Sequence, residues 1–137
     1  MVQTAKKTIQ IEIKRQDPEI NNGESYNQVY YVGVEDWFTV LDALIKIREE
    51  IDGTLSLRCA CRASICGSCA MRVNGQAKLV CKTKLSVVEK NNKVLIEPVG
   101  NMPVISDLAS DFKPFWDKFN AVDPYIKPEG EVPDGEY

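Results

Sequence analysis

The chain has 137 residues, with 17 basic and 20 acidic side chains, a formal net charge of −3 and no histidine. This length leaves room for one core, and no apolar run reaches the 18 or more residues that span a bilayer. The absence of histidine excludes a Rieske centre and histidine-ligated haem. The first seven residues, MVQTAKK, lack the features of a secretory signal or a transit peptide, which predicts a reducing, cytoplasmic setting.

Two strands are predicted at the start of the chain. Ile9, Ile11 and Ile13 alternate with polar residues, a pattern typical of a half-buried strand. Residues 28–34 follow the loop Asn21-Asn22-Gly23 and read as the hairpin partner of that strand. Together the two segments predict one edge of a mixed sheet.

A helix is predicted over residues 39–51, and we expect it to pack on that sheet. Thr39 and Asp42 have the spacing of a capping box, and an apolar stripe interrupted by charge runs on to Asp52-Gly53.

Four cysteines follow with the spacing C-x4-C-x2-C-x11-C, namely Cys61, Cys66, Cys69 and Cys81. Plant-type ferredoxins hold one [2Fe–2S] cluster with four thiolates, three of them on a C-x4-C-x2-C loop. Structural zinc modules usually offer two close pairs of ligands, and only Cys66 and Cys69 are so spaced here. The spacing therefore predicts one [2Fe–2S] cluster on these four residues, with a structural zinc module held by four cysteines or spectator thiols as alternatives.

The fourth ligand can be placed by counting along a predicted hairpin. Asn74-Gly75 between two short strand-like runs favours a two-residue type I′ turn. Val73 then pairs with Gln76, and the same register carries Cys69 opposite the residue before Cys81. Cys81 should therefore lie one step beyond Cys69, where it can close the cluster cage.

Cys59 is the fifth cysteine and could compete for the first ligand position. Only Cys61 gives the four-residue interval to Cys66. This favours Cys59 as a partly buried spectator thiol, with the rival assignment left open.

Later segments complete the predicted fold. Leu85–Glu89 and Lys93–Glu97 are predicted strands, separated by Lys90-Asn91-Asn92. The element order predicts an α+β fold, a β-grasp mixed sheet of the [2Fe–2S] ferredoxin type with one packed helix, over residues 1–106.

Residues 107–137 are predicted to form a helical segment and a linker. Asp107–Asn120 reads as a helix broken or restarted at Pro114. It carries four aromatic residues that need burial against this domain, an absent second half or a partner: Phe112, Phe115, Trp116 and Phe119. Residues 127–136 are rich in Pro, Gly and acid, which predicts an extended linker.

The segment SLRCACRASICGSCAM, from Ser56 to Met71, resembles the cluster loop of the iron–sulfur subunit of succinate dehydrogenase and fumarate reductase. CGSCAM and the eleven-residue interval are the specific marks. TVLDAL before the loop, and IEP and MPVISDL after it, extend the similarity over about residues 8–126. Members of that family often have Glu-Gly in place of Ala63-Ser64, so the backbone at Ser64 cannot rely on glycine's tolerance of positive φ.

The resemblance implies an electron relay without substrate chemistry on this chain. Electrons would pass between an FAD-containing flavoprotein subunit and this cluster, then between the cluster and further clusters on a second iron–sulfur domain or polypeptide, en route to or from quinone. Membrane anchor subunits would be contacted only indirectly, at the cytoplasmic face of the plasma membrane or on the matrix side of the mitochondrial inner membrane. The family's typical subunit continues into a second domain with more cysteines. This chain has none after Cys81, so it is expected to be an N-terminal half. A free-standing ferredoxin is the alternative.

Charge is unevenly distributed along the chain. Residues 58–84 hold six basic side chains and no acidic one, and the other residues hold 11 basic and all 20 acidic side chains. Positive charge near an anionic cluster favours its reduced state, although solvation and screening reduce the effect. Nucleic-acid binding is not expected, because the basic segment lacks interleaved aromatic residues.

Overall fold

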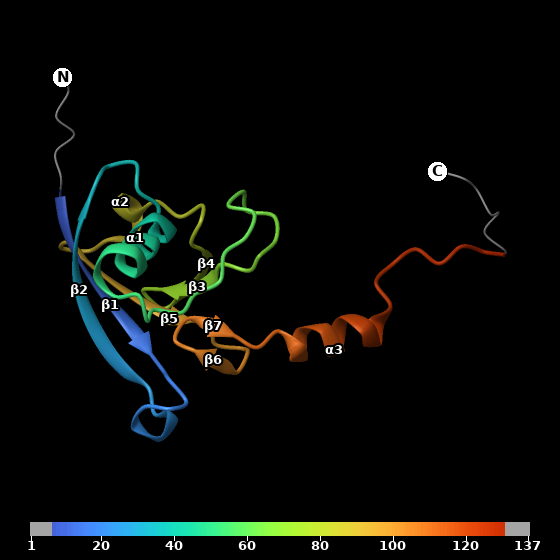
Figure 1. Cartoon of the computed structure of the whole chain (residues 1–137). Helices are drawn as coiled ribbons and strands as arrows, with labels where there is room; N and C mark the ends of the chain where they lie inside the picture. The colour runs from blue at the N-terminus through green and yellow to red at the C-terminus, as the bar shows by residue number, and fades with distance from the viewer. Residues whose placement is uncertain (1–6, 131–137) are drawn as a thin grey trace.

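The computed structural model describes residues 7–130 and contains a five-stranded mixed sheet (Figure 1). The strand order is β2-β1-β5-β3-β4. The central pair, β1 (Lys7–Arg15) and β5 (Lys93–Pro98), is parallel. β1 also pairs antiparallel with β2 (Tyr26–Val34), and β5 pairs antiparallel with β3 (Ala70–Val73), whose other neighbour is β4 (Gln76–Leu79). The predicted α+β fold is confirmed.

The alternation in β1 explains which face of the sheet is buried. Ile9, Ile11 and Ile13 are each at most 2% exposed, and successive side chains of a strand point to opposite faces. Ile11 lies opposite Tyr30 of β2 and Val94 of β5, and both partners are buried. This face of the sheet is therefore the floor of the core.

The helix α1 (Val40–Lys46) covers that core and continues into a π-helical turn, η2 (Ile47–Ile51). Its start is the predicted capping box, because Thr39 N donates to Asp42 Oδ2 at 2.8 Å and Asp42 N donates to Thr39 Oγ1 at 3.2 Å. Four apolar side chains of α1 are buried, so one face of the helix closes the core.

The β3–β4 hairpin has the predicted register. Val73 pairs with Gln76 and Ala70 with Leu79, and Asn74 and Gly75 both have positive φ, 49° and 84°, as a type I′ turn requires.

The segment predicted as a strand at residues 85–89 is instead a single helical turn, α2 (Leu85–Val88). Both sides of the nearby strand β5 are already paired, with β1 and β3. Leu85 is its one buried residue, whereas Val87 is 78% exposed. A single helical turn is enough to place Leu85 in the core, so this apolar segment does not need to pair with another strand.

The start of the predicted second segment also differs. Residues 104–110 form a small hairpin, β6 (Val104–Ser106) and β7 (Ala109–Ser110). The helix α3 (Lys113–Val122) begins only after it, with Pro114 in its first turn. Proline is tolerated there because the first N–H groups of a helix have no intrahelical partner. The predicted break at Pro114 is therefore the start of the helix.

α3 extends away from the sheet (Figure 1) and has no buried residue. Phe115, Trp116 and Phe119 pack on one another, with ring centroids 5.1–6.3 Å apart. They are 38–51% exposed, so packing against the rest of this domain does not bury them. Residues 123–130 continue without helix or strand, and the rest of the predicted linker lies outside the described residues.

No helix within residues 7–130 has the length and apolar character needed to cross a membrane. The division of the chain at residue 106 stays a prediction.

Candidate iron–sulfur site

Four of the five cysteines, Cys59, Cys61, Cys66 and Cys69, lie on a loop that follows η2 and returns to the sheet at β3, whereas Cys81 follows β4. Figure 1 shows the course of this loop. At its beginning, Leu55 is 2% exposed and belongs to the core. At its end, Cys69 is 3% exposed and precedes β3 directly. Between these fixed points, Cys61 and Cys66 are exposed. The loop therefore holds one side of the candidate site at the surface and the other side in the core.

Backbone amides surround the sulfur of Cys61. The N–H groups of Ala63, Ile65 and Cys66 all donate to Cys61 Sγ, at 3.3, 3.4 and 3.3 Å. Hydrogen bonds to the sulfurs are one of the ways in which a protein tunes an iron–sulfur cluster, and here three amide donors converge on one sulfur. A thiolate is the form in which cysteine binds iron.

Left-handed backbone conformations turn the loop so that its amides point inward. Arg62, Ser64 and Gly67 have φ values of 53°, 62° and 71°. Ser64 therefore keeps a left-handed backbone without glycine, at a cost of about 1–2 kcal/mol for a residue with a Cβ. Ser64 is thus a point of local strain in the loop.

The next two cysteines have opposite surroundings. Hydrogen bonding with Ser68, whose Oγ lies 3.2 Å from Cys66 Sγ, is the main cause that lowers the pKa of Cys66 to about 6, and contacts with Cys61 add to it. Burial is the main cause that raises the pKa of the Cys69 thiol, and the neighbouring thiol of Cys81 contributes. Burial makes the thiolate of Cys69 less stable, so binding to iron would have to stabilise it instead.

The hairpin places Cys81 as predicted. Val80 N donates to Cys69 O at 3.4 Å, so the pairing continues one step past β3 and β4, and Cys81 follows. The four predicted ligands are neighbours of one another, because Cys66 N donates to Cys61 Sγ and both Cys66 and Cys81 act on the thiol of Cys69. Within residues 7–130, no three Cys, Asp or Glu side chains are grouped closely enough to hold a single metal ion.

Cys59 is partly buried and packs against the hydrophobic core. Its environment is that of a small apolar side chain, in contrast to the amide-lined surface position of Cys61. This supports Cys61 as the first ligand, and the assignment stays a prediction.

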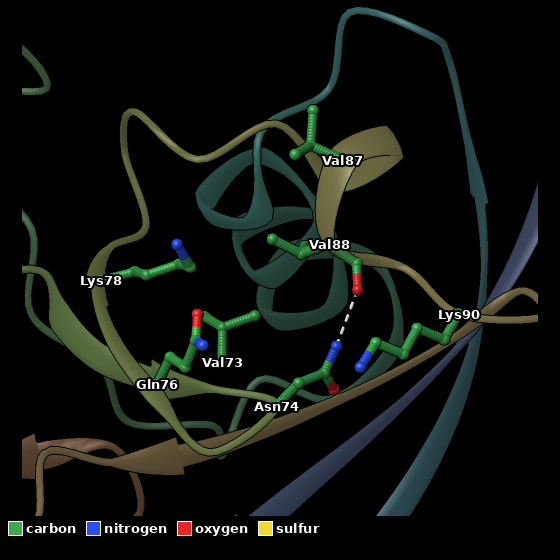
Figure 2. Close-up of a pocket in the computed structure, with 7 residues that line it drawn as sticks. All are labelled: Val73, Asn74, Gln76, Lys78, Val87, Val88 and Lys90. Atoms are coloured by element: carbon green, nitrogen blue, oxygen red, sulfur yellow. Dashed lines mark hydrogen bonds between the residues drawn. The ribbon is translucent and has the colours of Figure 1, made fainter.

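An apolar hollow of about 600 Å³ lies between the cysteine loop and α3. Cys66 and Gly67 line it on the loop side, and Phe112 and Trp116 line it on the other. Arg58 spans the two sides, with its guanidinium 5.9 Å from the ring centre of Phe112, within range of a cation–π interaction. A second hollow, of about 280 Å³, lies by α2 and contains no cysteine (Figure 2).

Sequence reasoning missed a buried polar group behind the loop. Arg15 is 5% exposed and forms ion pairs with Asp52 and Asp107. The sequence did indicate this burial. Arg15 lies an even number of residues from the buried isoleucines of β1, so its side chain points to the same face of the sheet, toward the core.

Comparison with known proteins agrees with this site. The family model described as "2Fe-2S iron-sulfur cluster binding domain" matches residues 10–117. The fumarate reductase iron–sulfur subunit of Mycobacterium tuberculosis is 41% identical over 94% of this chain and 52% of its own length. The mitochondrial succinate dehydrogenase iron–sulfur subunit of Dictyostelium discoideum is 37% identical, over 84% of this chain and 40% of its own length.

A solved structure, the Mycobacterium smegmatis Sdh1 complex in the apo form, contains a similar chain with a TM-score of 0.83 and 28% identity, over 97% of this chain and 54% of that one. The chain thus spans about half the length of the relatives it matches. Because the family model covers most of the chain, and because the cysteine loop directs three amide groups at the sulfur of Cys61, the chain belongs to the family of 2Fe–2S iron–sulfur cluster binding domains.

Proposed function

We propose that this chain is the electron-relay domain of a succinate dehydrogenase or fumarate reductase type assembly, with Cys61, Cys66, Cys69 and Cys81 as the ligands of its [2Fe–2S] cluster. The observation that carries the proposal is the set of three amide donors on Cys61 Sγ, in a chain whose relatives are named as iron–sulfur subunits of those enzymes. The cluster supplies one-electron redox chemistry. The chain supplies the thiolate ligands, the amide hydrogen bonds and a partly buried binding site.

The two sides of the site have different tasks in this proposal. The exposed Cys61 and Cys66 lie at the surface that a redox partner can approach. The buried Cys69 joins the site to β3 and the core, which holds the ligands in place between electron transfers. No substrate chemistry is assigned to this chain.

The proposed partners are an FAD-containing flavoprotein subunit and a second iron–sulfur domain or polypeptide. Membrane anchor subunits would be reached only through them, at the cytoplasmic face of the plasma membrane. The exposed rings of α3 border the hollow beside Cys66. We assign that aromatic surface to the second iron–sulfur domain, because burial of its apolar area is favourable by about 25 cal/mol per Å².

The ligand assignment is tested by replacing each cysteine with Ala in anaerobically prepared protein. Cys61→Ala, Cys66→Ala, Cys69→Ala and Cys81→Ala should each lose the visible spectrum and the reduced-state EPR signal. Cys59→Ala is the matched control and should keep both. Loss of the cluster in Cys59→Ala, or its retention in Cys61→Ala, would overturn the ligand set. A colourless protein containing zinc would support the zinc module.

The relay role is tested by anaerobic co-purification of the tagged chain from its native host. The expected result is a stoichiometric complex that contains a flavin-bearing subunit and further iron–sulfur clusters. A chain that carries its cluster but is recovered alone would favour the free-standing ferredoxin.

A further inference from the structure

The buried ion pair behind the loop is a bidentate one. Arg15 Nε donates to Asp107 Oδ1 at 3.1 Å, and Arg15 Nη2 donates to Asp107 Oδ2 at 3.0 Å. The side chains of Arg15 and Asp107 are only 6% and 1% exposed. Burial lowers the pKa of Arg15, but hydrogen bonding to Asp107 and its charge outweigh burial, so the pKa is raised overall. Arg15 thus stays charged and fixes the position of the Asp107 carboxylate.

Backbone groups also hold Asp107, because Gln16 N donates to Asp107 Oδ1 at 3.2 Å and Asp107 N donates to Gln16 O at 2.7 Å. The other carboxylate oxygen, Oδ2, also binds the beginning of the cysteine loop. Ser56 N donates to Asp107 Oδ2 at 2.9 Å, and in return Leu108 N donates to Ser56 O at 3.1 Å. Arg15 Nη2 also donates to Thr54 Oγ1 at 2.9 Å. Both backbone groups of Ser56 are therefore bound to residues 107–108, which come from a distant part of the sequence.

The two ends of the loop are held by different forces. The C-terminal end runs directly into β3, which is paired on both sides, with β4 and β5. The N-terminal end belongs to no sheet, and it is held by the burial of Leu55 and by the hydrogen bonds of Ser56 to residues 107–108. Cys59 and Cys61 follow Ser56 in the sequence. The stretch 57–60, which we call the leading arm, therefore takes its starting position from Leu55 and from the Ser56 contact together.

We propose that Asp107 is a positioning residue for the cluster: held by Arg15, it anchors Ser56 and through the leading arm keeps Cys61 in place and Cys59 against the core. Asp107 is not one of the proposed ligands and acts on the cysteine loop through Ser56. This inference rests on the proposed ligand set. It assigns the ion pair a task beyond stability, namely the control of how often the leading arm opens.

The site offers a direct probe of that opening. In the cluster-loaded chain four of the five cysteines are ligands in the proposed set, so Cys59 is the one free thiol of the sequence. Because Cys59 is partly buried, each opening of the leading arm should raise its rate of alkylation by iodoacetamide above the rate in the closed protein. The rate of alkylation, with the adduct located by mass spectrometry, measures the opening between Ser56 and Cys61 while the cluster absorbance shows that the protein remains loaded.

The test compares Asp107→Asn with Ile9→Ala in the loaded full chain. Asn is nearly isosteric with Asp but removes the charge that pairs with Arg15. Ile9→Ala removes buried apolar atoms and should lower the global stability by an amount comparable to that of Asp107→Asn. Ile9 lies about 20 Å from Arg15 along β1, at roughly 3.3 Å per residue. Asp107→Asn should accelerate Cys59 alkylation roughly tenfold, as expected when a charge-assisted hydrogen bond is lost. It should also change the visible circular dichroism of the cluster. Ile9→Ala should leave the dichroism unchanged and the alkylation rate close to that of the wild type.

Equal rates in Asp107→Asn and the wild type, or equal acceleration in both variants, would overturn the proposal. If Asp107→Asn does not fold, Asp107→Glu keeps the charge while shifting its oxygens by one methylene, and it should show a smaller acceleration of the same kind. No acceleration there would also count against the anchor. An adduct on Cys61 of the loaded wild type would instead refute the ligand set. Amide hydrogen exchange at Ser56, faster in Asp107→Asn than in Ile9→Ala if the anchor holds, would then decide the positioning role separately.

Discussion

Asn74 should be worth about 3 kcal/mol to the fold, because it combines an unusual backbone conformation with two side-chain hydrogen bonds. Asn74 Nδ2 donates to Val88 O at 2.7 Å (Figure 2), and Leu95 N donates to Asn74 Oδ1 at 2.9 Å. Each bond contributes about 1 kcal/mol net. The φ of 49° costs a residue such as Ala about 1 kcal/mol more, whereas Gly adopts it without strain.

Two substitutions separate these contributions. Asn74→Gly removes the hydrogen bonds alone and should lower the free energy of unfolding by about 2 kcal/mol. Asn74→Ala also adds the backbone strain and should lower it by about 3 kcal/mol. The assay is urea unfolding of the loaded chain, followed by far-ultraviolet circular dichroism and cluster absorbance. Equal stability of the Gly and Ala variants would refute the strain argument, and a Gly variant as stable as the wild type would refute the hydrogen-bond argument.

The hairpin register could be predicted from sequence because its determinants are local. Asn74-Gly75 selects the turn type, and the turn fixes every pair that follows, including the position of Cys81. The alternation of buried and exposed side chains along β1 was equally local. It also predicts that Arg15 faces the core, which sequence reasoning missed. What could not be predicted is what Arg15 meets, because Asp52 and Asp107 come from distant parts of the chain.

The errors also have a physical origin. An apolar run such as residues 85–89 does not show whether a neighbouring strand is free to pair with it. For residues 107–112, the pattern of aromatic residues hid a short hairpin before α3. The amide donors on Cys61 depend on the φ angles of Arg62 and Ser64, and the sequence carries no glycine at either position to signal them.

The charges and the exposed aromatic surface lead to three further predictions. Hydrogen bonds from Thr54 and Tyr30, together with the charge of Arg15, lower the pKa of Asp52 to about 2. The ionised carboxylate therefore stabilises the fold above about pH 4, and this contribution of about 2 kcal/mol is lost as the pH falls toward 2. Asp52→Asn should therefore be less stable at neutral pH, and its acid denaturation by circular dichroism should be less steep between pH 4 and 2; an unchanged profile would contradict the assignment. Arg62→Glu should lower the cluster midpoint potential in an EPR-monitored redox titration, most at low salt. Lys118→Glu on α3 is the control and should have a smaller effect. Equal midpoint potentials in the wild type and both variants would show that the basic segment does not influence the cluster. Trp116, now 51% exposed, should become protected when the second iron–sulfur domain covers α3, because the aromatic rings there bury little surface against this chain. Trp37→Phe leaves Trp116 as the single tryptophan of this chain. Acrylamide should quench its fluorescence more strongly in the isolated chain than in the assembly, and equal quenching in both would show that the surface of α3 is not the interface.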